Sequence, residues 1–170
     1  MKYTRAYSLV GSAVIALGFV SARALSASAA IPLISKRATF GAGCYWGTEK
    51  FLKDDFGTKA FSGSGRVVSG KVGFMGPESA KPNPTYREVC SGKTQHVEVY
   101  DLTFEGDHNT YEDLVKHFYS FHDPTTLNQQ GNDRGTQYAS VIFCHDDNQM
   151  KIAERVTVQL NEKVKAGKVP

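Results

Sequence analysis

Residues 37–56 read RATFGAGCYWGTEKFLKDDF, and this stretch indicates the class of fold. Residues 37–41 are β-prone, and Gly41 and Gly43 then interrupt the strand. Phe51, Leu52 and Phe56 follow at helical spacing. The pattern predicts a strand, a tight turn and a helix in succession, which is a local unit of an α/β fold.

Strands and helices go on alternating along the rest of the chain. The expected strands are a segment around residues 68–74, residues 96–104 and residues 138–144. The expected helices are one turn within 85–92, a helix that Asn109 or Thr110 caps, and residues 147–165. In the first of these strands, Val68, Val72 and Phe74 are expected on one face. Because no internal repeat is visible, we predict a single domain, a two-layer α/β sandwich with a mixed sheet.

The first thirty residues have a different character from the rest. They carry Lys2, Arg5 and Arg23 but no acidic residue, and an apolar run at 9–20 precedes the small residues SASAA. This order is typical of a signal peptide, and a transit peptide shares the composition. We therefore predict a leader at residues 1–30, a globular domain at 31–170, and an exported or organellar rather than a cytoplasmic protein. The apolar run is short for a membrane span, so no stable membrane association is expected after the leader is removed.

Charge gives no reason to expect a nucleic-acid partner. The chain has 20 basic and 17 acidic residues, a net charge of +3, and the leader accounts for the whole excess. Residues 31–170 carry equal numbers of basic and acidic residues, without a run of five or more like charges. Nucleic acids and anionic membranes attract strongly basic surfaces, so neither is a predicted partner.

The cysteines are an odd number at wide spacing, at positions 44, 90 and 144. They match no zinc pattern of paired cysteines and cannot all pair in disulfides, so at least one thiol is free. We predict no metal and no cofactor. Cys44 is the candidate nucleophile, because unpaired amides and the helix dipole at the start of a helix favour a thiolate.

The neighbours of Cys44 fit such a role. Gly43 allows a tight turn and lets a substrate approach the sulfur. Tyr45 and Trp46 can line an apolar pocket for a small group such as a methyl. A papain-like cysteine hydrolase also has an aromatic residue after its cysteine, but Gly41 stands where that family has another cysteine, and no histidine follows His145. A thioredoxin-like site is excluded because the sequence has no C-x-x-C motif.

Three segments together resemble the peptide methionine-S-sulfoxide reductase family. They are GCYWG at 43–47, NPTYREVCSGKTQHVEVY at 83–100 and HDPTTLNQQGNDRGTQYASVIF at 122–143. The resemblance extends over residues 38–164, with the motifs in the family's order and spacing. It implies a ferredoxin-like core and a peptide-methionine (S)-S-oxide reductase, which returns the S-epimer of methionine sulfoxide, peptide-bound and free, to methionine and so repairs oxidised proteins.

The resemblance also implies a role for each site residue. Cys44 matches the catalytic cysteine, and Tyr45 and Trp46 match the aromatic pair that holds the substrate methyl group, with tyrosine where phenylalanine is usual. Glu98, in QHVE where the family commonly has GHAE, matches the general acid. The other matches are two hydroxyls that bind the sulfoxide oxygen and one supporting acid, namely Tyr86, Tyr138 and Asp133.

Sulfoxide chemistry agrees with these roles. The sulfur of a sulfoxide is a poor electrophile until its oxygen is protonated, so a thiol needs a proton donor beside that oxygen. Glu98 lies among apolar residues of an expected strand, where loss of solvent should raise its pKa and keep a proton available. Tyrosine hydroxyls can stabilise the charge that develops at oxygen. Cys44 then remains as a sulfenic acid, which another thiol must reduce.

The recycling step is where the sequence departs from the family. Members often carry resolving cysteines in a C-terminal tail, whereas no resolving cysteine is identified in this sequence, and Cys90 is the less favoured internal candidate. We therefore expect thioredoxin or another dithiol to reduce Cys44 directly, in a monomer that acts on oxidised proteins and peptides. Gln95 stands where the family has glycine, which bears on the fit around Glu98. The alternative is a module that binds methionine sulfoxide without turnover.

Overall fold

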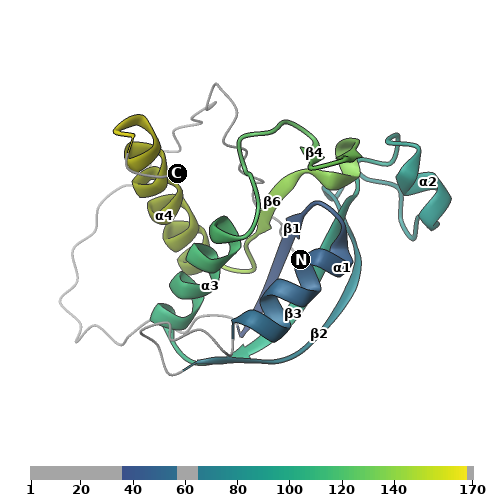
Figure 1. Ribbon diagram of the computed structural model, residues 1–170. Helices are drawn as coiled ribbons and strands as arrows, with labels where there is room; N and C mark the ends of the chain where they lie inside the picture. The colour runs from purple at the N-terminus through teal and green to yellow at the C-terminus, as the bar shows by residue number, and fades with distance from the viewer. Residues whose placement is uncertain (1–35, 57–64, 168–170) are drawn as a thin grey trace, which may run out of the picture.

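The computed structural model describes residues 36–56 and 65–167 (Figure 1). The predicted leader, residues 1–30, lies outside the described residues, so the leader and the compartment stay predictions. Within the described ranges, no helix is long and apolar enough to cross a membrane. Helices and strands alternate as the sequence predicts, which confirms the α/β class of fold.

A four-stranded sheet forms the centre of the fold. Its order is β2-β3-β1-β6, and its strands are β1 (Arg37–Ala42), β2 (Arg66–Met75), β3 (Val97–Glu105) and β6 (Ser140–Phe143). Every neighbouring pair is antiparallel. The prediction of a mixed sheet is therefore wrong.

The reason lies in which strands become neighbours. Since β1 and β2 are each antiparallel to β3, these two helix-connected strands run in the same direction but are separated by β3. In the same way β3 and β6 run in one direction, with β1 between them. β1 and β2, and likewise β3 and β6, therefore run in the same direction without being neighbours, so the split arrangement leaves no two parallel strands in contact within this sheet.

The helices match the expected segments closely. They are α1 (Tyr45–Lys50), which continues into a π-helical turn (Phe51–Asp55), α2 (Tyr86–Cys90), α3 (His108–Ser120) and α4 (Asp147–Lys165). A hairpin of two short strands, β4 (Gln129–Gln130) and β5 (Asp133–Arg134), and a 3₁₀ turn (Thr136–Tyr138) lie between α3 and β6. Local periodicity is informative for α3 and α4 because each of these two helices buries an apolar face.

Two local predictions need correction. Asp107, and neither Asn109 nor Thr110, caps α3: its carboxylate accepts hydrogen bonds from the backbone N–H groups of Asn109 at 2.9 Å and Thr110 at 3.1 Å. In β2 a bulge falls between Val67 and Ser69, so Val67 shares a face with Val72, and Val68 is 50% exposed. An extra residue in one strand shifts the alternation of faces by one position, which the sequence pattern did not reveal.

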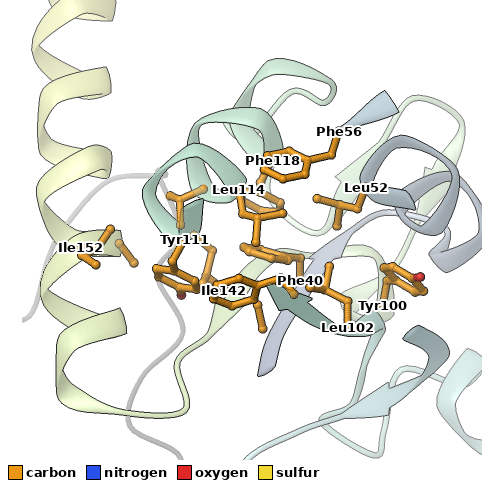
Figure 2. Close-up of a cluster of buried hydrophobic side chains, with 14 of the residues drawn as sticks. Phe40, Leu52, Phe56, Tyr100, Leu102, Tyr111, Leu114, Phe118, Ile142 and Ile152 are labelled. Carbon is orange, nitrogen blue, oxygen red and sulfur yellow. The ribbon is translucent and has the colours of Figure 1, made fainter. Parts of the chain in front are cut away.

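The main core lies between the helices and one face of the sheet (Figure 2). Phe40 on β1 is fully buried, with its ring centroid 5.3 Å from that of Phe118 and 6.5 Å from that of Tyr111 on α3. Tyr100, Leu102 and further apolar residues of β3 and β6 join this cluster. The opposite face carries a smaller cluster: Val97, Val99, Val141 and Phe143. Because Glu98 alternates with Val97 and Val99, it belongs to the face on which the helices pack.

Candidate active site

Cys44 lies between the end of β1 and the start of α1. Its carbonyl oxygen accepts hydrogen bonds from the backbone N–H groups of Gly47 at 3.0 Å and Thr48 at 3.2 Å, so the residue caps the helix. Its side chain is half-buried, and all three cysteines of the chain are free. The thiol therefore stands at the N-terminal end of a short helix, the position that the sequence predicts.

Two glycines are required for this turn. Gly43 has a φ of +84°, which only glycine adopts readily, and a Cβ atom there would lie 2.6 Å from Cβ of Gln130. A Cβ atom on Gly41 would lie 2.8 Å from Cγ1 of Val97 and 2.9 Å from the carbonyl oxygen of Glu98. The end of β1 thus lies tightly against the β3 backbone beside Glu98, just before Cys44.

Glu98 lies on β3, and its buried carboxyl group is next to the start of α1. It is 2% exposed, and its Oε2 atom accepts a hydrogen bond of 3.0 Å from the backbone N–H of Tyr45, the residue after Cys44. This N–H is one of the unpaired amides of the helix start. Burial raises the pKa of Glu98, the Tyr45 hydrogen bond opposes that rise, and the negative charge of Asp133 adds to it. The net effect is a raised pKa, as the sequence predicts, so folding makes the Glu98 carboxyl group a weaker acid than a free glutamic acid.

The β4–β5 hairpin and the 3₁₀ turn bring Asp133 and Tyr138 into the same electrostatic environment. Burial raises the pKa of Tyr138, and the negative charges of Glu98, Asp133 and Cys90 raise it further. Tyr138 and Asp133 are both half-buried. The protonated phenol is therefore the form available at neutral pH, and it can donate a hydrogen bond.

Tyr86 belongs to the same group of interacting residues, although it is 56% exposed. A hydrogen bond to Cys90, one turn further along α2, is the main cause that raises the pKa of Tyr86 to about 12. The charges of Cys90, Glu98 and Tyr138 contribute in the same direction. α2 itself is held by a capping box, in which Thr85 and Glu88 exchange hydrogen bonds. The structure thus brings Tyr86 toward Glu98 and Tyr138, with its hydroxyl engaged by Cys90.

Aromatic rings form one side of the site. The ring centroid of Tyr45 lies 5.4 Å from that of Trp46 and 5.9 Å from that of Phe74, and the Phe74 centroid lies 6.2 Å from that of Tyr86. Trp46 is 66% exposed and Tyr45 is half-buried. Apolar walls and an open side suit a methyl group carried on a peptide, because the rest of the peptide can stay outside.

Phe74 is a member of the site that the sequence did not indicate. It pairs with Glu98 across the β2–β3 ladder, so its ring lies on the same face of the sheet as the carboxyl group. Strand alternation placed Phe74 on a face of β2, but only the register shows which residue of β3 lies opposite. The register between β2 and β3, had it been known, would have indicated that Phe74 lies opposite Glu98.

The other ionisable groups are less suited to catalysis. Burial raises the pKa of the Cys144 thiol to about 11, and its sulfur contacts the Tyr111 hydroxyl at 3.9 Å inside the core. A buried, protonated thiol is inert. Over residues 36–56 and 65–167, no three histidine, cysteine or acidic side chains are grouped so that they could hold a metal ion.

Taken together, the fold and the site are those of an α/β domain with a half-buried cysteine at the start of a helix and a buried carboxyl group of raised pKa bonded to the backbone of the next residue. The sequence model of the peptide methionine sulfoxide reductase family matches residues 36–169. This chain therefore belongs to the peptide methionine sulfoxide reductase family.

Individual relatives agree with this assignment. The chain is 48% identical over 127 residues to the peptide methionine sulfoxide reductase MsrA of Methanothermobacter thermautotrophicus, with 75% of this chain and 69% of that protein aligned. It is 44% identical over 127 residues to MsrA of Polynucleobacter asymbioticus, with 75% and 61% aligned. The match thus spans about two thirds of the length of these relatives.

Solved structures show the same similarity. Methionine sulfoxide reductase A of Corynebacterium diphtheriae superposes with a TM-score of 0.63 at 35% identity, over 79% of this chain and 60% of that one. Reduced Mxr1 from Saccharomyces cerevisiae gives a TM-score of 0.64 at 34% identity, over 79% and 72%. These values support the antiparallel α/β fold described above.

Proposed function

We propose that this chain reduces the S-epimer of methionine sulfoxide, peptide-bound and free, to methionine, with Cys44 as the nucleophile. The observation that carries the proposal is the placement of Glu98. This buried carboxyl group has a raised pKa and is hydrogen-bonded at 3.0 Å to the backbone N–H that follows Cys44. A proton donor and a nucleophile side by side are what a sulfoxide requires.

The reaction balances with these groups alone. Glu98 protonates the sulfoxide oxygen, and the sulfur of Cys44 attacks the activated substrate. Overall the sulfoxide S–O bond breaks, an S–O bond to Cys44 forms, and two electrons pass from the cysteine sulfur to the methionine sulfur. The products are one methionine and one sulfenic acid on Cys44.

The remaining residues bind the two ends of the reacting group. Tyr138 and Tyr86 donate hydrogen bonds to the sulfoxide oxygen, Tyr86 after it releases Cys90. Tyr45 and Trp46 contact the methyl group, and Gly43 leaves the thiol accessible. Asp133, whose charge raises the pKa of Glu98, helps to keep the general acid protonated.

A dithiol such as thioredoxin would complete the cycle. Its first thiol attacks the sulfenic acid of Cys44, which gives a mixed disulfide and water, and its second thiol then releases Cys44 as a thiol. Direct reduction is our proposal because Cys144 is buried in the core, and Cys90, though exposed, is engaged by Tyr86.

A single-turnover assay without reductant tests the activity. The full chain is mixed with a peptide that carries the S-epimer of methionine sulfoxide, and methionine and free thiols are counted. We expect one methionine formed and one thiol lost per chain, no reaction with the R-epimer, and none with Cys44→Ser. Cys90→Ser is the matched control and should react like the wild type. If the wild type and Cys44→Ser both bind the peptide but neither reduces it, the chain is a binding module.

The role of Glu98 is tested in the same assay. Glu98→Gln keeps the size and the hydrogen-bond acceptor for Tyr45 but cannot supply the proton. We expect a rate about 10²- to 10⁴-fold lower, with a flatter dependence on pH. A variant that is as fast as the wild type would remove Glu98 from the mechanism.

The recycling route is tested by mass spectrometry after one equivalent of substrate. We expect a sulfenic acid on Cys44, trapped by a nucleophilic reagent, and its loss on addition of reduced thioredoxin. A disulfide between Cys44 and Cys90 would show that an internal cysteine resolves the intermediate.

A further inference from the structure

Gln130 is a half-buried side chain beside the turn before Cys44, and the proposed chemistry does not use it. It lies on β4, and its aliphatic part packs on Gly43. A Cβ atom on Gly43 would lie 2.6 Å from Cβ and 2.9 Å from Cγ of Gln130. The β4–β5 hairpin therefore rests, through this side chain, on the turn that presents the thiol.

The amide end of Gln130 is held at two points by the backbone of Asp123. The N–H of Asp123 donates to Oε1 of Gln130 at 3.3 Å, and Nε2 of Gln130 donates to the carbonyl oxygen of Asp123 at 3.3 Å. An amide group has both a donor and an acceptor, and here one residue engages the two. The amide is therefore fixed in orientation as well as in position.

The segment that contains Asp123 is itself anchored to the framework of the fold. The neighbouring His122 is hydrogen-bonded to the carbonyl oxygen of Phe118 at 2.6 Å and to the hydroxyl of Ser140 at 2.8 Å. Phe118 belongs to the buried face of α3, and Ser140 is the first residue of β6. Gln130 thus joins the hairpin to the turn after β1 and to the anchored segment that follows α3.

Asp133 is the functional group that this arrangement positions. Gln130 and Asp133 are direct cross-strand partners in the hairpin, so the two residues move together. The charge of Asp133 acts on Glu98, and the interaction of two charges weakens as the distance between them grows. The place of the hairpin on the Gly43 turn therefore decides how strongly Asp133 influences the site.

We propose that Gln130 is a positioning residue, whose aliphatic part and amide together hold the hairpin on the Gly43 turn and so keep the Asp133 carboxylate close to Glu98. The inference rests on the proposed function, in which Asp133 helps to keep Glu98 protonated. Without the amide contact the hairpin is no longer tied to Asp123, and Asp133 moves away from Glu98.

Gln129 offers a matched control, because it is the same type of residue at the neighbouring position of β4 and is also half-buried. Its Nε2 donates to the carbonyl oxygen of Gly131 at 2.9 Å, and its Oε1 accepts from Arg134 at 3.1 Å. Both bonds stay within the hairpin and do not tie it to the rest of the fold. Gln129→Met and Gln130→Met therefore lose similar surface hydrogen bonds, but only Gln130→Met loses the attachment.

Single-turnover rates over a range of concentrations of the sulfoxide peptide test the proposal. Methionine is close to glutamine in size, so Gln130→Met keeps the packing on Gly43 and removes the amide. We expect the maximal rate to fall about 10-fold, and the half-saturating peptide concentration to change less than about 2-fold, because Tyr45 and Trp46 lie on α1 and are untouched. Gln129→Met should stay within about 2-fold of the wild type in both quantities. A Gln130→Met variant as fast as the wild type, or an equal loss in the two variants, would overturn the proposal.

Two further measurements separate positioning from an effect on the fold. The midpoints of urea unfolding should be alike for Gln129→Met and Gln130→Met, because each variant loses two surface hydrogen bonds. In a double-mutant cycle, Gln130→Met and Asp133→Asn should each lower the maximal rate about 10-fold, and the double variant about 10- to 20-fold, where independent effects would give about 100-fold. Losses that multiply, or a midpoint of Gln130→Met clearly below that of Gln129→Met, would show that Gln130 acts through the fold.

The proposed function and this inference fail in different ways. If the wild type does not reduce the sulfoxide peptide at all, the function is wrong and the role of Gln130 falls with it. If the wild type is active and Asp133→Asn is slow, but Gln130→Met matches the wild type, only the role of Gln130 is wrong. If the wild type is active and Asp133→Asn is equally fast, the hairpin carries no group that needs positioning, and the inference is again overturned while the function stands.

Discussion

Gly41→Ala is expected to weaken both the fold and the site, although it adds only one methyl group. The new Cβ atom would lie 2.8 Å from Cγ1 of Val97 and 2.9 Å from the carbonyl oxygen of Glu98. Carbon atoms in contact normally lie about 3.5–4.0 Å apart, so β1 and β3 must separate locally by about 0.5–1 Å. The Glu98 carbonyl belongs to a sheet ladder and cannot rotate away as a side chain could.

The size of the effect follows from two opposing contributions. Overpacking of this kind costs about 1–3 kcal/mol, while alanine restricts the unfolded chain and stabilises by about 0.4–1 kcal/mol. We therefore expect the free energy of unfolding to fall by about 1–2 kcal/mol, measured by urea titration. The two strands would separate beside Glu98, whose carboxylate accepts a hydrogen bond of 3.0 Å from the backbone N–H of Tyr45. The single-turnover rate should therefore fall about 10- to 100-fold.

Gly73→Ala is the matched control. Gly73 lies in β2, which pairs with β3 on the side away from β1. Apart from its two chain neighbours, no described residue has an atom within 4 Å of the position that a Cβ atom on Gly73 would take. Its stability should change by about 0.5 kcal/mol or less, or rise slightly. The reasoning is refuted if Gly41→Ala is as stable and as fast as the wild type, or if Gly73→Ala is equally damaging.

Three further predictions concern single side chains. Gln95→Gly should raise the free energy of unfolding, measured in urea, by about 0.5–1 kcal/mol. Gln95 has a φ of +61°, and the backbone strain that glycine would release, about 1–2 kcal/mol, exceeds the entropic cost of glycine. An unchanged midpoint of urea unfolding would contradict this expectation. Burial raises the pKa of Glu98, so this group stabilises the fold below its ordinary pKa and loses that contribution as the pH rises through its folded-state pKa. Between about pH 4 and pH 7 the wild type should therefore lose more stability than Glu98→Gln. Equal losses of stability in parallel urea titrations would argue against the raised pKa. Asp107→Ala removes the acceptor for the first amides of α3 and should lower the free energy of unfolding by about 1 kcal/mol, seen as a Tm about 3 °C lower in circular dichroism; an unchanged Tm would show that the cap contributes nothing.

Gln95 shows how a departure from the family pattern acquires a physical meaning. By the resemblance it stands where the family has glycine, and the structure gives it a left-handed backbone conformation. That conformation is unfavourable for glutamine and ordinary for glycine. The chain nevertheless enters β3 in register, with Glu98 opposite Phe74, so the strain does not displace the carboxyl group from the site.

Elements whose signals are local could be predicted from the sequence. The helix expected at about 147–165 is observed at Asp147–Lys165, where its apolar residues repeat at helical spacing and Asp146 caps its first turn. In β2, Val72 and Phe74 share a face as predicted, but Val68 was assigned to that face wrongly because one bulge residue shifts the alternation. The direction of neighbouring strands was also wrong, since it depends on which strand inserts between β1 and β2.

The sequence by itself determined which residue types take part in the site. The order of motifs around Cys44, Glu98 and Tyr138, together with the turn that glycine allows, was enough to identify the family and to predict Cys44 as the nucleophile. Such signals can be read from the sequence alone because a turn, a helix start and a motif each depend on neighbours a few residues away.

Only the tertiary structure decided how those residues act on one another. The raised pKa of Glu98 results from burial under α1 and from the charge of Asp133, which lies 35 positions further along the chain. The ring of Phe74 joins the site through the strand register, which sets it opposite Glu98. Burial and charge act through space, so the acidity of a carboxyl group is a property of the packed molecule and is absent from the order of its residues.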